Sequence, residues 1–191
     1  MIIEKHFKDN CILRAMIPEF DKNGNLPPIG LIRPTIQEFE QRFVEANIEK
    51  FRGELYRGYK NYCSHLISRK MASIQWVDGS YTTTKPRPKD IDLVVHFDGM
   101  KLHSDANLQK DFKRLINEDD MKAEYNCHPQ YVLVYPKYMI DLYNLYKKEY
   151  NHWLKWFLKD KKGNPKGLIE FNIVNDNFKS DGTDNGVVNH G

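Results

Sequence analysis

The sequence has few cysteines, no long apolar run and almost no excess of charge of either sign. Its three cysteines, Cys11, Cys63 and Cys127, are odd in number and widely spaced, which is typical of free thiols in a reducing compartment. The N-terminus lacks the apolar core of a signal peptide, and no window approaches the roughly 20 apolar residues that cross a bilayer. These absences argue against a disulfide framework, a zinc site and a membrane span, and they predict a cytoplasmic protein.

The charge balance does not favour nucleic acid as a partner. The chain carries 29 basic and 26 acidic residues, for a formal net charge of +3. A protein whose main partner is a polyanion usually has a clear basic excess. Hydrophobic residues make up 40% of the 191 positions and aromatic residues 13%, which is sufficient for the core of one globular domain.

Composition divides the chain into three parts. Residues 1–34 form an N-terminal segment and a Pro/Gly-rich arm, whose interspersed apolar residues predict packing on the domain. Residues 35–175 form the domain, and 176–191 contain so few apolar residues that a flexible tail is expected. Residues 21–24 of the arm are a turn signature. A Ca²⁺ loop is the alternative there, although the further ligands of such a site are absent.

Hydrophobic periodicity predicts helices interleaved with strands, which makes this a mixed α/β (α+β) domain. Thr35, with Glu38 three residues later, has the spacing of a capping box and predicts a helix start. Further helices are expected over about 48–70, 104–117 and 139–159. Strands are expected over 73–78, 91–97, 130–135 and 168–174. The acidic run at 118–120 is expected to be a solvent-facing turn.

Two features near the C-terminal end allow more than one interpretation. The helix over 139–159 has an aromatic stripe, which is usually core but is also compatible with a partner-binding face. The lysines at 161, 162 and 166 lie in a Gly/Pro turn and are expected to be solvated. The alternative is that Lys166 reaches a nucleotide phosphate.

Two carboxylates, Asp90 and Asp92, open the strand that follows residue 90. Side chains alternate along a strand, so both point the same way while Ile91 and Leu93 point into the core. Adjacent like charges favour a cation between them, and oxygen-only ligands suit Mg²⁺ or Mn²⁺. The alternative is structural: strand-end carboxylates that accept nearby N–H groups or pair with Lys89.

A tight turn, Gly79-Ser80, ends the preceding strand. Gly79 allows the backbone to approach a ligand closely, and Ser80 adds a hydroxyl and an N–H. The polar loop that follows, from Thr82 to Lys85, completes a plausible phosphate cradle. A phosphate site and a metal site are therefore expected at the ends of two neighbouring strands.

The combined pattern resembles the signature of the polymerase-β-like nucleotidyltransferase superfamily. Its parts are Val77-Asp78-Gly79-Ser80 and, after a short spacer, Asp90-Ile91-Asp92-Leu93. With residues 17–28 and 166–169 included, the chain is similar over about residues 16–174 to a small, poorly characterised bacterial nucleotidyltransferase-like family. The resemblance implies a twisted mixed sheet flanked by helices.

The resemblance also implies an activity: transfer of an NMP from an NTP, with ATP as the first candidate, to a hydroxyl of a protein or nucleic acid. Metal ions held by Asp90 and Asp92 would neutralise the triphosphate, and Gly79 and Ser80 would hold its terminal phosphates. Charge-assisted contacts would come from the spacer: Lys85, Arg87 and Lys89. By analogy with small members that act in toxin–antitoxin or defence modules, a protein partner or acceptor is expected.

The chain departs from the superfamily pattern in its third carboxylate. The strand over 130–135 contains no acid, so Glu170 on the last strand is the first substitute and Asp141 the second. If neither reaches the pair, the alternative is a catalytically degenerate module that binds a nucleotide or a partner. His96 and His128 lie near strand ends and are expected to be ordinary polar or packing residues.

Overall fold

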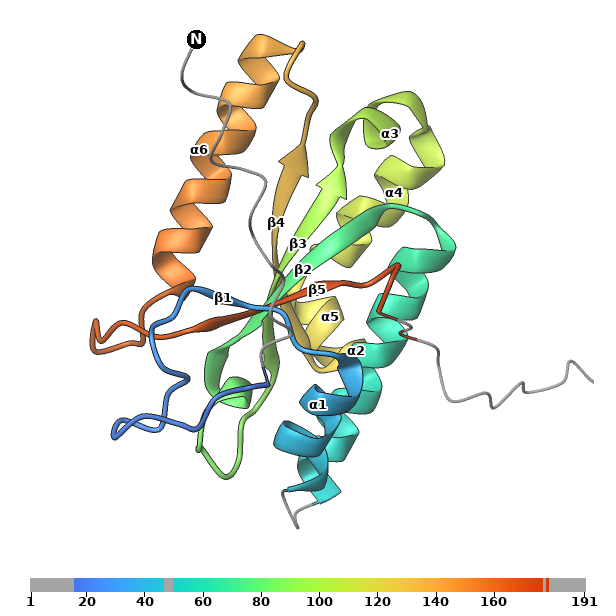
Figure 1. Ribbon diagram of the computed structural model, residues 1–191. Coiled ribbons are helices and arrows are strands. Elements are labelled where there is room, and N and C mark those ends of the chain that lie inside the picture. The colour runs from blue at the N-terminus through green and yellow to red at the C-terminus, as the bar shows by residue number, and fades with distance from the viewer. Residues whose placement is uncertain (1–15, 47–49, 177, 179–191) are drawn as a thin grey trace, which may run out of the picture.

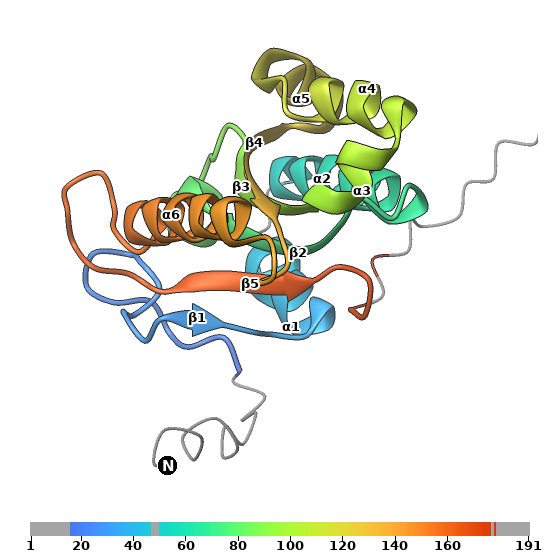
Figure 2. The ribbon, with the colours of Figure 1, turned by 90° about the horizontal axis from the view of Figure 1, so that it is seen from above.

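A computed structural model of the chain describes residues 16–46, 50–176 and 178. Its architecture is α+β, with one five-stranded mixed sheet covered by helices on both faces (Figures 1 and 2). The predicted fold class is thereby confirmed. The N-terminal segment up to residue 15 and nearly all of the expected tail, 177 and 179–191, lie outside the described residues.

The sheet has the strand order β1-β5-β2-β3-β4. Strand β2 pairs antiparallel with both β3 and β5, whereas β3 with β4 and β1 with β5 are parallel pairs. The strands are β1 (Leu31–Ile32), β2 (Ala72–Asp78), β3 (Ile91–Asp98), β4 (Cys127–Val134) and β5 (Leu168–Asn172). Strands β2 and β3 form the centre of the sheet, and their connection is the Gly79-to-Asp90 stretch.

Helices α2 to α5 lie on one side of the sheet and α6 on the other (Figure 2). The helices are α1 (Ile36–Glu40), α2 (Lys50–Ser68), α3 (Gly99–Ser104), α4 (Ala106–Leu115), α5 (Glu118–Tyr125) and α6 (Ile140–Phe157). A π-helical turn, Gln41–Glu45, extends α1, and Thr35 with Glu38 forms the predicted capping box at its start. None of the helices in the described ranges is long and apolar enough to cross a membrane.

The larger core lies between the sheet and α2. The odd-numbered side chains of β3, from Ile91 to Phe97, point into it and meet the buried stripe of α2 that includes Tyr59 and Leu66. Cys63 and Cys127 are free thiols in this core, and burial raises the pKa of both. Phe178, expected in the tail, is buried at 4% exposure against Tyr59 and Phe171.

The smaller core lies between the sheet and α6. Trp76, Val94 and Val132 project from three neighbouring strands toward the aromatic stripe of α6, where Tyr150 stands edge-on to Trp76 at 4.9 Å. His96 packs in the same layer and is buried, and this burial lowers its pKa to about 4. Because α6 alone covers this face of the sheet, several aromatic side chains of α6 are only half-buried.

Two expectations fail at the edge of the sheet. The acidic run at 118–120 is not a turn; it is the first turn of α5, with Asn117 accepting a hydrogen bond from the Asp120 N–H as its N-cap. Acidic residues are favoured there by the helix dipole, so the run is a helix start. Strand β4 begins at Cys127 rather than 130, and His128 therefore joins the sheet.

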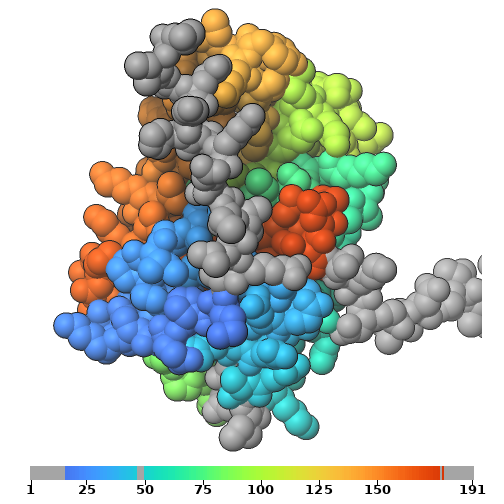
Figure 3. Space-filling model, in the orientation of Figure 1, coloured from blue at the N-terminus to red at the C-terminus, as the bar shows by residue number. Residues whose placement is uncertain are grey.

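The arm from residue 16 to 30 is hydrogen-bonded both to the β2–β3 connection and to the loop that precedes β5. The Gly24 carbonyl accepts from the Thr84 N–H at 3.0 Å, and the Leu26 carbonyl accepts from the Gly167 N–H at 2.9 Å. Asp21 closes its own turn by accepting from the Asn23 and Asn25 N–H groups, which gives a structural reason for this acid. In Figure 3 the arm, in blue, lies between the green loop and the orange loop that precedes β5.

Candidate functional site

The Gly-Ser turn and the Asp pair meet at one end of the sheet. Asp78 is the register partner of Asp92 across β2 and β3, which places the turn residue Gly79 over the Asp92 carboxylate. A Cβ added to Gly79 would lie 1.7 Å from Asp92 Oδ2, and the φ of Gly79 is +78°. Both the contact and the left-handed backbone therefore require glycine. Ser80 follows in the short 3₁₀ turn Gly79–Thr82.

Asp90 and Asp92 are partly open to solvent, with 25% and 31% of their side chains exposed. Burial, and next the negative charge of Asp90, raise the pKa of Asp92. Lys122 Nζ lies 3.9 Å from Asp90 Oδ2, at the outer limit of an ion pair. Lys89, the partner in the structural alternative, is exposed. The pair thus has the like-charge proximity expected of a cation site.

His128 lies directly beside Asp92 in the parallel β3–β4 ladder. Its Nδ1 is 3.0 Å from Asp92 Oδ1, and its Nε2 is 2.8 Å from Glu118 Oε2 on α5. Gln130 Nε2 donates to the other oxygen of Glu118, and the hydrogen bonds from Gln130 and His128 lower the pKa of Glu118. The imidazole therefore connects a site carboxylate to a surface carboxylate, a position that the late predicted start of β4 concealed.

Asp78 is a third carboxylate at this end of the sheet, and sequence reasoning missed it. Its side chain lies on the same face as Asp92, and its Oδ1 accepts a hydrogen bond from Lys166 Nζ at 2.5 Å, with both side chains 7% exposed. Burial raises the pKa of Asp78 to about 7, and the Lys166 ammonium opposes that rise only in part. The alternation of side chains along β2 could have indicated this position, because it places residue 78 on the same face of the sheet as Trp76.

Glu170 and Asp141, the substitutes for a third acid, lie away from the pair. Glu170 is opposite Trp76 on β5, two strands from β3, and it accepts from Trp76 Nε1 at 2.9 Å and Arg33 Nε at 2.6 Å. Asp141 is in the first turn of α6, which follows the far end of β4 (Figure 1). The far end is about 20 Å from Asp92 along the strands. The structure therefore brings neither acid to Asp92.

The remaining predicted phosphate contacts divide into inward and outward groups. Thr82 is buried, and its hydroxyl faces Asp78 Oδ1 and the Gly79 carbonyl, both at 3.4 Å. Lys85 and Lys89 are exposed, as their predicted role requires. Lys166, the alternative phosphate ligand, is instead buried against Asp78. Thr82 thus stabilises the turn from inside the protein, and the two exposed lysines remain available to a ligand.

A buried arginine from α2 holds the loop that carries these residues. Arg52 is 1% exposed, and its guanidinium donates to the carbonyls of Phe43, at 2.8 Å, Lys85, at 3.0 Å, and Tyr81. It also stacks over the Tyr81 ring at 4.5 Å, and the Tyr81 hydroxyl donates back to the Arg52 carbonyl. The planar fork satisfies three carbonyls at once, which fixes the start of the β2–β3 loop.

Replacing Arg52 by Lys is expected to lower the free energy of unfolding by about 2–3 kcal/mol, because one ammonium cannot reproduce the fork and leaves buried carbonyls unpaired. Urea denaturation measures the loss. Arg57→Lys changes an exposed arginine on the same helix and should stay within about 0.5 kcal/mol of wild type. A loss for Arg52→Lys no larger than that of Arg57→Lys would contradict the clamp.

The residues at this end of the sheet fit a magnesium or manganese ion held jointly with a ligand. Mg²⁺ in nucleotide sites is typically bound by one or two carboxylates together with phosphates and water. Asp90 and Asp92 supply such a pair. Over residues 16–46, 50–176 and 178, no group of three or more His, Cys, Asp and Glu side chains is arranged to hold a metal ion. The donor set therefore suits a substrate-assisted ion rather than a closed structural site.

Comparison with protein-family models matches residues 18–172 to a family of unknown function, DUF6932. The match spans most of the chain, so the chain belongs to that family. No curated protein and no solved structure matches the sequence.

Proposed function

We propose that this member of DUF6932 is a metal-dependent nucleotidyltransferase that transfers an NMP, first of all AMP, from an NTP to a hydroxyl. One observation carries the proposal: the Gly79-Ser80 turn and the Asp90–Asp92 pair adjoin so closely that a Cβ at Gly79 would meet the Asp92 carboxylate. A backbone turn that offers N–H groups beside two partly exposed carboxylates is an arrangement that binds a phosphate and its cation together.

The carboxylates of Asp90 and Asp92 would hold Mg²⁺ or Mn²⁺. When bound, such an ion would neutralise phosphate charge and favour the ionised form of the hydroxyl that attacks the α-phosphate, from which pyrophosphate leaves. The Gly79-Ser80 turn orients the terminal phosphates through backbone N–H groups, and Lys85 and Lys89 add positive charge from the open side of the loop. The Arg52 clamp keeps the loop in place before the nucleotide arrives, which reduces the ordering cost of binding.

Asp78 and His128 flank Asp92 on its two neighbouring strands. Asp78 lies opposite Asp92 and has its proton affinity raised by burial, and the His128 imidazole is 3.0 Å from the other side of Asp92. His128 is thus within hydrogen-bonding distance of Asp92, whereas Asp78 is bound by Lys166. A hydroxyl acceptor entering beside Asp92 would find hydrogen-bonding partners there, although the third carboxylate, Asp78, is already bound by Lys166.

A catalytically degenerate binding module is the second candidate. It is favoured because the further acids already have partners: Asp78 is bound by Lys166, and Glu170 by Trp76 and Arg33. Such a protein would bind nucleotide or a protein partner without turnover. The expected toxin–antitoxin or defence context remains a prediction for either candidate.

The test measures Mg²⁺-dependent binding of a nonhydrolysable ATP analogue by calorimetry, followed by transfer of α-labelled nucleotide. Asp92→Asn is expected to weaken Mg²⁺-dependent binding by at least about tenfold, because it removes a ligand from a two-carboxylate site. Glu170→Gln is the matched control from the same sheet face and should change affinity less than about twofold.

The outcomes separate the two candidates. Label transfer that is lost in Asp92→Asn supports the transferase, and nucleotide binding without transfer to any acceptor supports the binding module. Wild-type protein that binds neither Mg²⁺ nor any NTP would exclude the transferase and would leave only a module that binds a protein partner.

A further inference from the structure

One segment of the chain is rich in lysine. Between Lys147 and Lys166 there are seven lysines and two acids, Glu149 and Asp160. This excess is larger than the net charge of +3 of the whole chain, so the rest of the molecule carries a net negative charge. The near-neutral total, which argued against a polyanionic partner, therefore conceals a local excess of lysines, six of which lie outside the buried Lys166–Asp78 pair.

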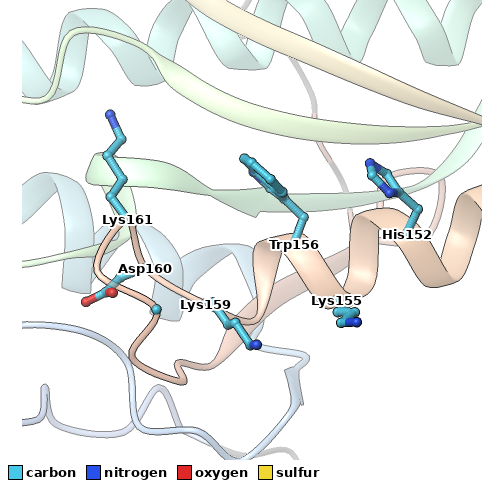
Figure 4. A pocket seen from close by; sticks show the side chains of 7 residues that line it. His152, Lys155, Trp156, Lys159, Asp160 and Lys161 are labelled. Atoms are coloured by element: carbon cyan, nitrogen blue, oxygen red, sulfur yellow. The ribbon is translucent and has the colours of Figure 1, made fainter.

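A pocket of about 650 Å³ lies on this segment, at the C-terminal end of α6 and the loop after it (Figure 4). Its lining comprises His152, Lys155, Trp156, Lys159, Asp160, Lys161 and Gly163. Trp156 is 69% exposed, although tryptophan is usually well buried. In Figure 4 Trp156, His152 and Lys161 project to one side, and Lys155 and Lys159 to the other.

Asp160, the one acid in the pocket lining, stabilises the fold of the loop. Asp160 accepts from the side chains of Asn164 and Asn25 at 2.9 and 3.0 Å and from the backbone N–H groups of Lys162 and Asn164. These hydrogen bonds, led by that from the Asn164 side chain, lower its pKa. Its oxygens are thus used to fold the loop and attach it to the arm, which leaves the lysines without an acid partner from the pocket itself.

We propose that this pocket docks single-stranded nucleic acid, with a base stacked on Trp156 and a phosphate against Lys161 on the same side, and with the phosphates of the flanking strand against Lys155 and Lys159 on the other side. Proteins that bind single strands combine an exposed aromatic platform with lysines that follow the backbone. A duplex keeps its bases stacked inside and offers no face to the indole. An acidic peptide would use the lysines but not the exposed ring.

The loop of the docking site is joined to the candidate active site through Lys166. The loop that carries Lys161 is closed by an isolated bridge between Lys159 and Pro165 and by the Lys166 N–H donating to the Leu158 carbonyl. The Lys166 side chain then binds Asp78 opposite Asp92. The role of the pocket as the site for the hydroxyl acceptor rests on the proposed transferase function. Its affinity for a single strand does not, because strand binding is measured without nucleotide.

The test measures fluorescence anisotropy of a labelled single-stranded RNA of about 12 nucleotides, within the usual site-size range. Trp156→Ala is expected to weaken binding by about tenfold, as loss of one stacked base implies. Tyr138→Ala is the matched control: it removes a 76% exposed aromatic side chain before the other end of α6, and affinity should change less than about twofold.

Salt dependence tests the lysines separately. Lys155→Gln and Lys161→Gln should each reduce the slope of log affinity against log salt by about 0.7, the value for one single-strand phosphate contact. Lys113→Gln, an exposed lysine on α4, should leave the slope unchanged. All of these side chains are exposed, so loss of the fold does not confuse the result.

Three results would overturn the proposal: no salt-sensitive binding by wild type, equal affinity of Trp156→Ala and wild type, or equal competition by duplex RNA or polyglutamate. Asp92→Asn should bind the strand as wild type does. If strand binding persists while Mg²⁺-dependent nucleotide binding is absent, the proposed function fails alone. If nucleotide binds and the strand does not, the docking site fails alone.

Discussion

Replacing Lys166 by Met is expected to lower the free energy of unfolding at pH 8 by about 3–5 kcal/mol, the usual cost of removing one partner from a buried ion pair. The ammonium lies 2.5 Å from Asp78 Oδ1, and both side chains are 7% exposed. Met has a similar length, so the volume is conserved and the lost charge dominates. Urea denaturation followed by circular dichroism measures the change.

The loss should depend on pH in a defined direction. Burial raises the native pKa of Asp78 to about 7, above its ordinary value of 3.8, so between these values the native state holds a proton that the unfolded chain has released. The contribution of Asp78 to the free energy of unfolding therefore falls as pH rises from about 4 to about 7. Without Lys166 the native pKa rises further, and the deficit of Lys166→Met should be larger at pH 8 than at pH 5.

Two variants control this interpretation. The double variant Asp78→Asn/Lys166→Met removes both charges and should recover most of the loss, because a neutral pair has no uncompensated ion. Lys162→Met, an exposed lysine of the same loop, should remain within about 0.5 kcal/mol of wild type. A double variant less stable than Lys166→Met at pH 8 would show that the pair does not act through its charge.

The parts of the fold that sequence reasoning predicted have strong local signals. The Thr35 capping box, the stripe of α2 and the two strands around Gly79 were all found within about two residues of their observed bounds. The two-residue strand β1 and the early start of β4 were missed. Both are fixed by pairing with distant strands, and β4 begins with Cys127, His128 and Pro129, which have no strand pattern of their own.

The candidate site was predictable only where one stretch of chain supplies it. Gly79, Asp90 and Asp92 belong to a single hairpin, so alternation and a short spacer were sufficient to place them. His128 and Lys166 reach the site from segments 36 and 88 residues away from their partners. Their roles depend on strand register, which is why Glu170 was chosen on its chemistry and then found two strands away.

Replacing Gly79 by Ala is expected to weaken Mg²⁺-dependent binding of the ATP analogue by at least about tenfold, because the carboxylate that it displaces is a proposed metal ligand. The added Cβ would lie 1.7 Å from Asp92 Oδ2 and 2.6 Å from its Cγ, so Asp92 must move. The left-handed φ of +78° adds strain of about 1 kcal/mol, and the displaced packing raises the total to about 2–4 kcal/mol.

Gly30→Ala is the matched control for backbone strain. Gly30 has a φ of +87°, and a Cβ there would meet nothing within 4 Å, so only the strain of about 1 kcal/mol is expected and nucleotide affinity should not change. Combining Gly79→Ala with Asp92→Ala removes the colliding oxygens, and the two stability losses should be less than additive by about 1–2 kcal/mol. Strict additivity of the stability losses, or equal stability and nucleotide affinity of Gly79→Ala and Gly30→Ala, would mean that the turn does not position the Asp92 carboxylate.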